Sequence, residues 1–168
     1  APCHATLSVT TPAVPLASAP AGNTNVPVLD PATGQVSIPP GTPAGSYSIT
    51  YKLCETLNAN ITVPNCVSTT VTVVVGAAPI VATNDPLTAV NGATGSTSAG
   101  NAFTGDTING APATTSNATL AVVTPATSIN GGPVPSMDPL TGIVSVPAGT
   151  PAGSYTITYK LCEKLNAT

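Results

Sequence analysis

The sequence DPATGQVSIPPGTPAGSYSITYKLCETLN at residues 30–58 returns as DPLTGIVSVPAGTPAGSYTITYKLCEKLN at residues 138–166, with 23 of 29 positions identical. The two copies lie 108 residues apart, close to the length of one small β-sandwich domain. A module that is copied nearly unchanged usually supplies length, spacing or equivalent surfaces, and seldom a catalytic centre. The chain is therefore expected to belong to a tandem array.

Polar and apolar residues alternate within both copies. This period-two pattern predicts a strand whose buried face carries Tyr47, Ile49, Tyr51 and Leu53, repeated by Tyr155, Ile157, Tyr159 and Leu161. A second strong strand is expected at residues 67–75, and weaker ones at 6–10, 26–29, 35–38, 120–124 and 143–146. Many short strands separated by Pro- and Gly-rich turns predict an all-β fold of tandem immunoglobulin-like β-sandwich repeats.

Tyr47 and Tyr155 each follow a Gly-Ser pair at the start of a strong strand. In immunoglobulin-like sandwiches, a tyrosine near this place donates its phenol to the backbone of the preceding loop. The alternative is an ordinary core tyrosine.

The alignment of the copies extends beyond the long motif, because Ala5-Thr6-Leu7 matches Ala118-Thr119-Leu120. This predicts one repeat at residues 1–76 that lacks its leading strands and a second at 77–168 that lacks its last strand. The missing pieces are complementary: residues 80–112 have no counterpart in the first copy, and residues 66–75 have none in the second.

The composition argues against several classes of function. Charged residues make up 5% of the 168 residues, with three lysines, no arginine and a net charge of -3, so nucleic acid is an improbable partner. His4 is the only histidine, and no catalytic pairing recurs in both copies, so we expect no enzyme. No apolar run is long enough to span a membrane, and residue 1 does not open a signal peptide.

Cys54 and Cys66 stand at the end of one strong strand and the start of the next. In a hairpin these ends face each other, so a disulfide is predicted there, which places the protein outside the cytoplasm. The alternatives are two reduced core cysteines or half of a metal site, although neither a Cys-x-x-Cys spacing nor a neighbouring histidine supports metal.

Cys162 repeats Cys54, and Cys3 is the cysteine that remains. One hypothesis is a Cys3–Cys162 bridge, in which the amino-terminal segment of one subunit completes the carboxy-terminal domain of the next. The alternative is a longer covalent array whose repeats continue on both sides of these residues.

The motif VPAGTPAGSYTITYKLCEKLN at residues 146–166, with Asn65-Cys66 and the segment TINGAP at 107–112, resembles the tandem immunoglobulin-like repeats of giant Bacteroidota surface proteins. The resemblance covers nearly the whole chain. It implies secretion by the type IX route and a role in long adhesins, including gliding-motility adhesins and grappling filaments. The implied partners are neighbouring copies of the repeat and a surface or cell-envelope ligand whose identity the resemblance does not carry.

Further site predictions are weaker. Thr107, in Asp106-Thr107-Ile108, fits the short O-glycosylation signal of that phylum, whereas the Asn-x-Thr triplets at 60–62, 117–119 and 166–168 are discounted as chance matches. Four aspartates could supply oxygen ligands to calcium, but they form no dense acidic loop and are predicted to be solvated turn residues: Asp30, Asp85, Asp106 and Asp138. Lys52 and Lys160 are assigned to the polar face of the tyrosine strand rather than to isopeptide bridges.

These observations favour an extracellular structural repeat in the stalk or filament of a bacterial adhesin, with no cofactor. The alternatives are a filament subunit that polymerises by donor-strand exchange and a ligand-binding β-sandwich module. Clustered loop aromatics would favour the module, yet Phe103 is the only aromatic residue outside the tyrosine strands.

Overall fold

The structure is a computed structural model, and it describes residues 4–57 and 65–166. Every regular element within those ranges is a β-strand, and all strand pairs are antiparallel. Such antiparallel sheets are compatible with a β-sandwich. The described residues include no helix with the length and apolar character needed to cross a membrane.

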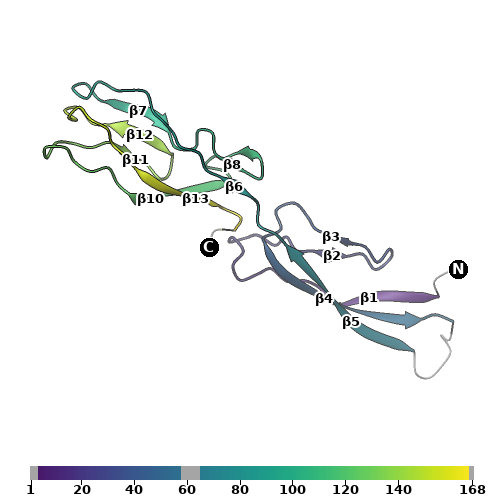
Figure 1. Ribbon diagram of the computed structural model, residues 1–168. Coiled ribbons are helices and arrows are strands. Elements are labelled where there is room, and N and C mark those ends of the chain that lie inside the picture. The colour runs from purple at the N-terminus through teal and green to yellow at the C-terminus, as the bar shows by residue number, and fades with distance from the viewer. Residues whose placement is uncertain (1–3, 58–64, 167–168) are drawn as a thin grey trace. The chain divides into compact units, whose positions relative to one another are not determined.

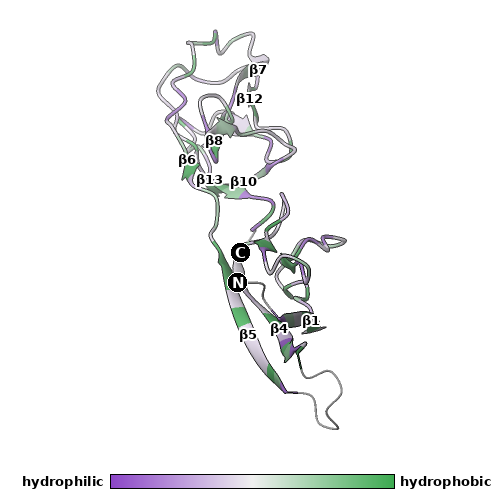
Figure 2. Ribbon diagram, turned by 90° about the vertical axis from the view of Figure 1, so that its right-hand side faces the viewer, coloured by the Kyte–Doolittle hydropathy of each residue, from purple (hydrophilic) through white to green (hydrophobic). Residues whose placement is uncertain are grey.

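The chain divides into two compact units, one ending at Ala77 and the other starting at Ala78. The first unit is built on a sheet of order β1-β4-β5, with β1 at Ala5–Thr11, β4 at Gly45–Glu55 and β5 at Cys66–Val75 (Figure 1). A short hairpin of β2 (Val28–Leu29) and β3 (Val36–Ser37) completes its strands. Burial alternates in the second half of β5, where Val71, Val73 and Val75 are half-buried while Thr72 and Val74 are exposed, and separate hydrophobic bands are visible along the strand (Figure 2).

The core of the first unit forms where β4 meets β2 and β5. Tyr47 and Ile49 of β4 are 2% and 1% exposed and cluster with Leu29 and Ala13. Three valines of β5, which lies on the edge of β4 opposite β1, pack against this cluster: Val71, Val73 and Val75. The predicted buried face is therefore observed at Tyr47 and Ile49, but it is wrong at the other end of β4, where Leu53 is 39% exposed.

The second unit contains three small sheets. Their strands are β6 (Ile80–Val81), β8 (Thr107–Ile108) and β9 (Ala111–Pro112); β7 (Ser96–Asn101), β11 (Ser136–Met137) and β12 (Ile143–Val146); and β10 (Ala118–Thr124) with β13 (Thr158–Glu163). The core draws on all three, with Ile108, Leu120, Met137 and Leu161 buried together.

The sequence repeat is also a repeat of strand pairing. Leu7 lies opposite Leu53 in the β1–β4 pair, and Leu120 lies opposite Leu161 in the β10–β13 pair. Both pairs have an irregularity at the same place, after Val9 in one and after Val122 in the other. Equivalent sequences thus select the same register, including its irregularity.

Local polar contacts recur as well. Tyr47 and Tyr155 each donate a hydrogen bond from the phenol to the carbonyl four residues earlier, of Pro43 and of Pro151, both at 2.8 Å. Asp30 and Asp138 each accept a backbone N–H two residues on, at 2.8 Å and 2.9 Å, and a threonine hydroxyl three residues on. Both aspartates are exposed turn residues.

Candidate functional site: the open edge of strand β13

Strands β4 and β13 have nearly the same sequence but differ in their neighbours. β4 lies between β1 and β5 and is hydrogen-bonded on both edges, whereas β13 pairs only with β10 among the described strands. Residues 45–49 of β4 pair solely with β5, from Gly45 opposite Val75 to Ile49 opposite Val71. Their counterparts at 153–157 form no strand.

This difference corrects the sequence-based expectation of a full strand at residues 155–161. The observed strand begins only at Thr158, where pairing with Thr124 of β10 begins. The reason is that a strand needs a neighbour to accept its backbone hydrogen bonds, and period-two patterning cannot supply one.

The open edge leaves apolar side chains partly uncovered. Tyr47 and Ile49 are almost fully buried in the first unit, whereas their counterparts Tyr155 and Ile157 are only half-buried. Because exposed apolar area costs free energy in proportion to its extent, this edge is a place where covering the surface would stabilise the unit.

A groove of about 1030 Å³ runs beside this edge within the second unit. One side is formed by residues 150–159 and another by residues 82–92. Met137, Val144 and Ile157 line the groove and also pack in or against the core. The groove therefore gives access from outside to the apolar interior of the unit.

The two units bury opposite ends of the shared strand pair. Leu161 is 9% exposed in the second unit, but its counterpart Leu53 is 39% exposed in the first. Conversely, the β4 end that carries Tyr47 is covered, and the equivalent end at Tyr155 is open. The end of the strand pair that is buried in one unit is therefore the more exposed end in the other.

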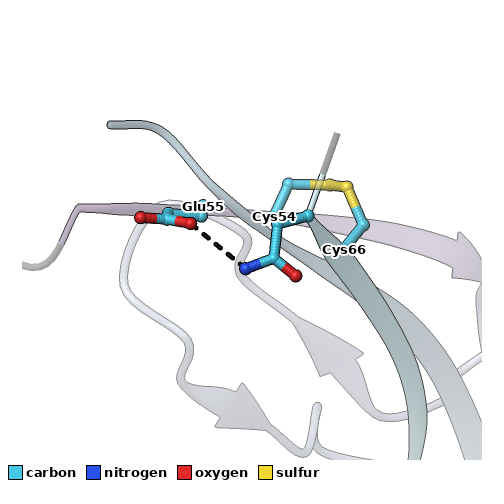
Figure 3. Close-up of a disulfide and its surroundings, with 4 residues drawn as sticks. Cys54, Glu55 and Cys66 are labelled. Atoms are coloured by element: carbon cyan, nitrogen blue, oxygen red, sulfur yellow. Dashed lines mark hydrogen bonds between the residues drawn. A yellow bond between two sulfur atoms is a disulfide. The ribbon is translucent and has the colours of Figure 1, made fainter. Parts of the chain in front are cut away.

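The predicted disulfide joins Cys54 of β4 to Cys66 of β5, which are direct cross-strand partners with a Cα–Cα distance of 4.1 Å (Figure 3). Next to it, the amide of Asn65 donates a 3.1 Å hydrogen bond to the carboxylate of Glu55. The bridge fastens the ends of the two longest strands, where a sheet would otherwise fray.

Cys162 occupies the position of Cys54 at the open edge of β13. It is a half-buried free thiol opposite Thr119 of β10, and no strand among the described residues lies on its other side. Cys3, its proposed partner, falls outside the described residues, as do residues 60–62 of the first Asn-x-Thr triplet and the last two residues of the third.

A polar cluster lies at the wall of the groove, where Asp85 and Tyr159 are half-buried lining residues and Asp106 is buried. The phenol of Tyr159 donates to Asp85 at 2.7 Å and lies 3.4 Å from the carboxylate of Asp106. Asp106 is 1% exposed and also accepts the backbone N–H of Thr83 at 2.7 Å. The cluster ties residues 83–85 to β13, so it sets one wall of the groove.

The cluster also changes the chemistry of Tyr159. Its burial, the hydrogen bond to Asp85 and the charges of the two aspartates raise the pKa of Tyr159 well above its usual range. The expectation that Asp106 is a solvated turn residue is wrong, because the 103–106 turn places its side chain inside the unit. The sequence offers no local signal for this burial.

The aspartates at Asp30 and Asp138 have different surroundings. Their turn hydrogen bonds, led by the Thr33 hydroxyl for Asp30 and by the Leu140 N–H for Asp138, lower the pKa of both carboxyl groups. The described part of the chain holds no group of three or more His, Cys, Asp or Glu side chains arranged to bind a metal ion.

The remaining predicted residues are separate from the groove. Thr107 is half-buried in β8 opposite Val81 and Pro112, and Asn117 uses its side chain within a turn, donating to the carbonyl of Pro112 at 3.1 Å. Lys52 is half-buried opposite Ser8 and Ser68, and Lys160 is exposed. The sequence predicts the disulfide from strand ends that face each other in a hairpin, whereas it carries no signal for the groove.

No family model, curated protein or solved structure matches this chain.

Proposed function

We propose that the chain is an extracellular structural repeat that builds the stalk or filament of a bacterial cell-surface adhesin. In this proposal the units are tandem immunoglobulin-like β-sandwich repeats that act as spacers. The observation that carries the proposal is the identical register of β1–β4 and β10–β13, irregularity included, in two copies of one sequence. A spacer is built by repeating one shape along a chain, and two copies with the same register have that property.

The strand arrangement also fits a load-bearing role. β4 and β5 pair over ten consecutive positions, from Gly45 opposite Val75 to Cys54 opposite Cys66. The disulfide at the second of these ends holds the strands together even if the hydrogen bonds between them break. Disulfides persist mainly in oxidising compartments, which supports a location outside the cytoplasm.

The sequence resemblance to Bacteroidota adhesin repeats supplies the biological setting for this proposal. Attachment, gliding and prey capture all require a surface group to be held away from the cell by a long spacer. A repeat with few charges and a Thr- and Ser-rich exterior fits such a spacer, because it offers no strong electrostatic patch to any one ligand.

Immunogold electron microscopy of intact cells of the source organism tests the proposal, using antibodies raised against the 168 residues. We expect label along filaments at the cell surface, together with an oxidised Cys54–Cys66 pair in material alkylated before lysis. Label confined to the cell interior, or a reduced Cys54–Cys66 pair in the native material, would overturn the proposal. Antibody Fab fragments that block surface attachment would identify adhesion as the role.

A further inference from the structure

The open edge of β13 has a filled counterpart in the same chain. In the first unit, β5 lies along β4 and contributes Val71, Val73 and Val75 to the core. In the second unit, the register of β10 and β13 is the same, but no described strand pairs with the other edge of β13, and a groove walled by residues 82–92 and 150–159 adjoins it. The first unit therefore shows what kind of segment covers this edge.

We propose that the open edge of β13, with its groove, binds an antiparallel polypeptide strand of the β5 type. Such a strand begins with cysteine and carries valine or a similar residue at the fifth, seventh and ninth positions after it, as Cys66–Val75 does. This site goes beyond the proposed function and rests on the open edge of the second unit and on the paired counterpart of that edge in the first unit.

The register of the bound strand follows from the first unit. Its cysteine lies opposite Cys162, and its three inward residues lie opposite Ile157, Tyr155 and Gly153, as the counterparts in β5 lie opposite Ile49, Tyr47 and Gly45. The inward residues then cover the half-buried Tyr155 and Ile157. Residues 154–157 gain a neighbour and can complete the strand that the sequence predicts.

The free thiol of Cys162 provides a second, covalent contact. In the first unit the equivalent Cys54 is bonded to the first residue of β5. A strand whose cysteine is held as a mixed disulfide can transfer to Cys162 by thiol–disulfide exchange. The Cys162 thiol loses its proton to solvent, its thiolate attacks the strand's sulfur, and the original partner leaves as a thiolate.

The strand phase favours this occupant over the segment that starts at Cys3. Counting from Cys3, the fifth and seventh residues are Ser8 and Thr10, which would point polar side chains at the groove. The same segment already forms β1 and pairs with β4. A β5-type strand instead places valines at every one of these inward positions.

A synthetic peptide of residues 66–75 tests the site. Its cysteine is activated as a mixed disulfide with an aromatic thiol, whose release is followed by absorbance. The full chain is used with Cys3→Ser, so that Cys162 is the free thiol while Cys54–Cys66 stays bridged. A matched control peptide carries Val71→Thr, Val73→Thr and Val75→Thr.

The valine peptide should couple to Cys162 at least about tenfold faster than the threonine peptide, because burial of the three valines holds the two sulfurs together. It should also slow hydrogen exchange of residues 153–162 and leave residues 45–55 unchanged. Equal coupling rates for the two peptides would overturn the proposal, as would protection that appears only outside residues 153–162.

A non-covalent measurement separates strand binding from thiol reactivity. A peptide with Cys66→Ser should still protect residues 153–162 at high peptide concentration, whereas the threonine version should not. Two results together would refute a strand site: fast coupling of Cys162 to any activated thiol, and no slowing of hydrogen exchange at residues 153–162 by the serine peptide. They would show only that Cys162 is reactive. Neither result depends on where the protein is found in the cell.

Discussion

Cys54 and Cys66 form the contact whose removal has the most direct consequence for stability. The bridge closes a loop of sequence separation 12 between the two longest strands. Replacing Cys54 by serine should lower the free energy of unfolding of the first unit by about 3 kcal/mol, since the unfolded chain regains the entropy of that loop. This loss is measured by urea unfolding that is monitored through the hydrogen exchange of residues 45–55.

The matched control for this variant is Cys162→Ser at the equivalent position of β13. Because Cys162 is unbridged, its replacement should leave the first unit's unfolding unchanged and alter the second unit little. A loss in the first unit of less than about 1 kcal/mol for Cys54→Ser would show that pairing along β4 and β5 holds the strands without the bridge.

Tyr159 gives the second unit a dependence on alkaline pH. Its pKa is raised in the folded state, so the unfolded chain loses the phenol proton first, at about pH 10. Stability is therefore complete below that pH and falls as pH rises toward the folded-state pKa. Urea midpoints of the second unit, compared at about pH 8 and about pH 11, should show this fall.

The variant Tyr159→Phe should remove this part of the pH dependence. It should also cost about 1 kcal/mol at neutral pH, because Asp85 and Asp106 lose a hydrogen-bond donor. Tyr51→Phe makes the same change at the matched position of the first unit and should leave the second unit's pH profile intact. An unchanged alkaline slope in Tyr159→Phe would contradict the role of the cluster.

At the scale of elements, two segments of nearly equal sequence differ in whether a neighbouring strand pairs with them. Residues 46–49 and 154–157 read Ser-Tyr-Ser-Ile and Ser-Tyr-Thr-Ile, so their intrinsic exchange rates are nearly equal. Only the first set pairs with β5. Hydrogen exchange should therefore be at least about a hundredfold slower at the alternate residues of 46–49 whose N–H groups face β5 than at their counterparts in 154–157. Similar protection of both sets would mean that β13 finds a neighbour in solution.

The same comparison shows what could be predicted from the sequence. The hairpin of the two strong strands, its disulfide and the inward Tyr47 and Ile49 follow from local alternation and from strand ends that face each other in a hairpin. Two features depended on distant residues and were not predictable: the burial of Asp106, which is set by a turn and by Thr83, and the missing strand at residues 154–157. Residues 154–157 line the groove, and Asp106 holds Thr83 of its other wall by a hydrogen bond, so the candidate site was the least predictable part.

At the scale of the whole molecule, the end of the strand pair that is buried in one unit is the more exposed end in the other. A chain extended after Thr168 by a copy of residues 61–75 would supply β13 with a strand and Cys162 with a cysteine in the register of the first unit. We expect the free energy of unfolding of the second unit in this extended chain to rise by at least about 3 kcal/mol, from burial at Tyr155 and Ile157 and from the new bridge.

The matched control carries threonine at the three inward valines of the appended strand, so it keeps the cysteine but loses the apolar face. Urea unfolding under oxidising and reducing conditions separates the two contributions. Equal stabilisation by both extensions would assign the whole gain to the disulfide and contradict a groove shaped for a strand.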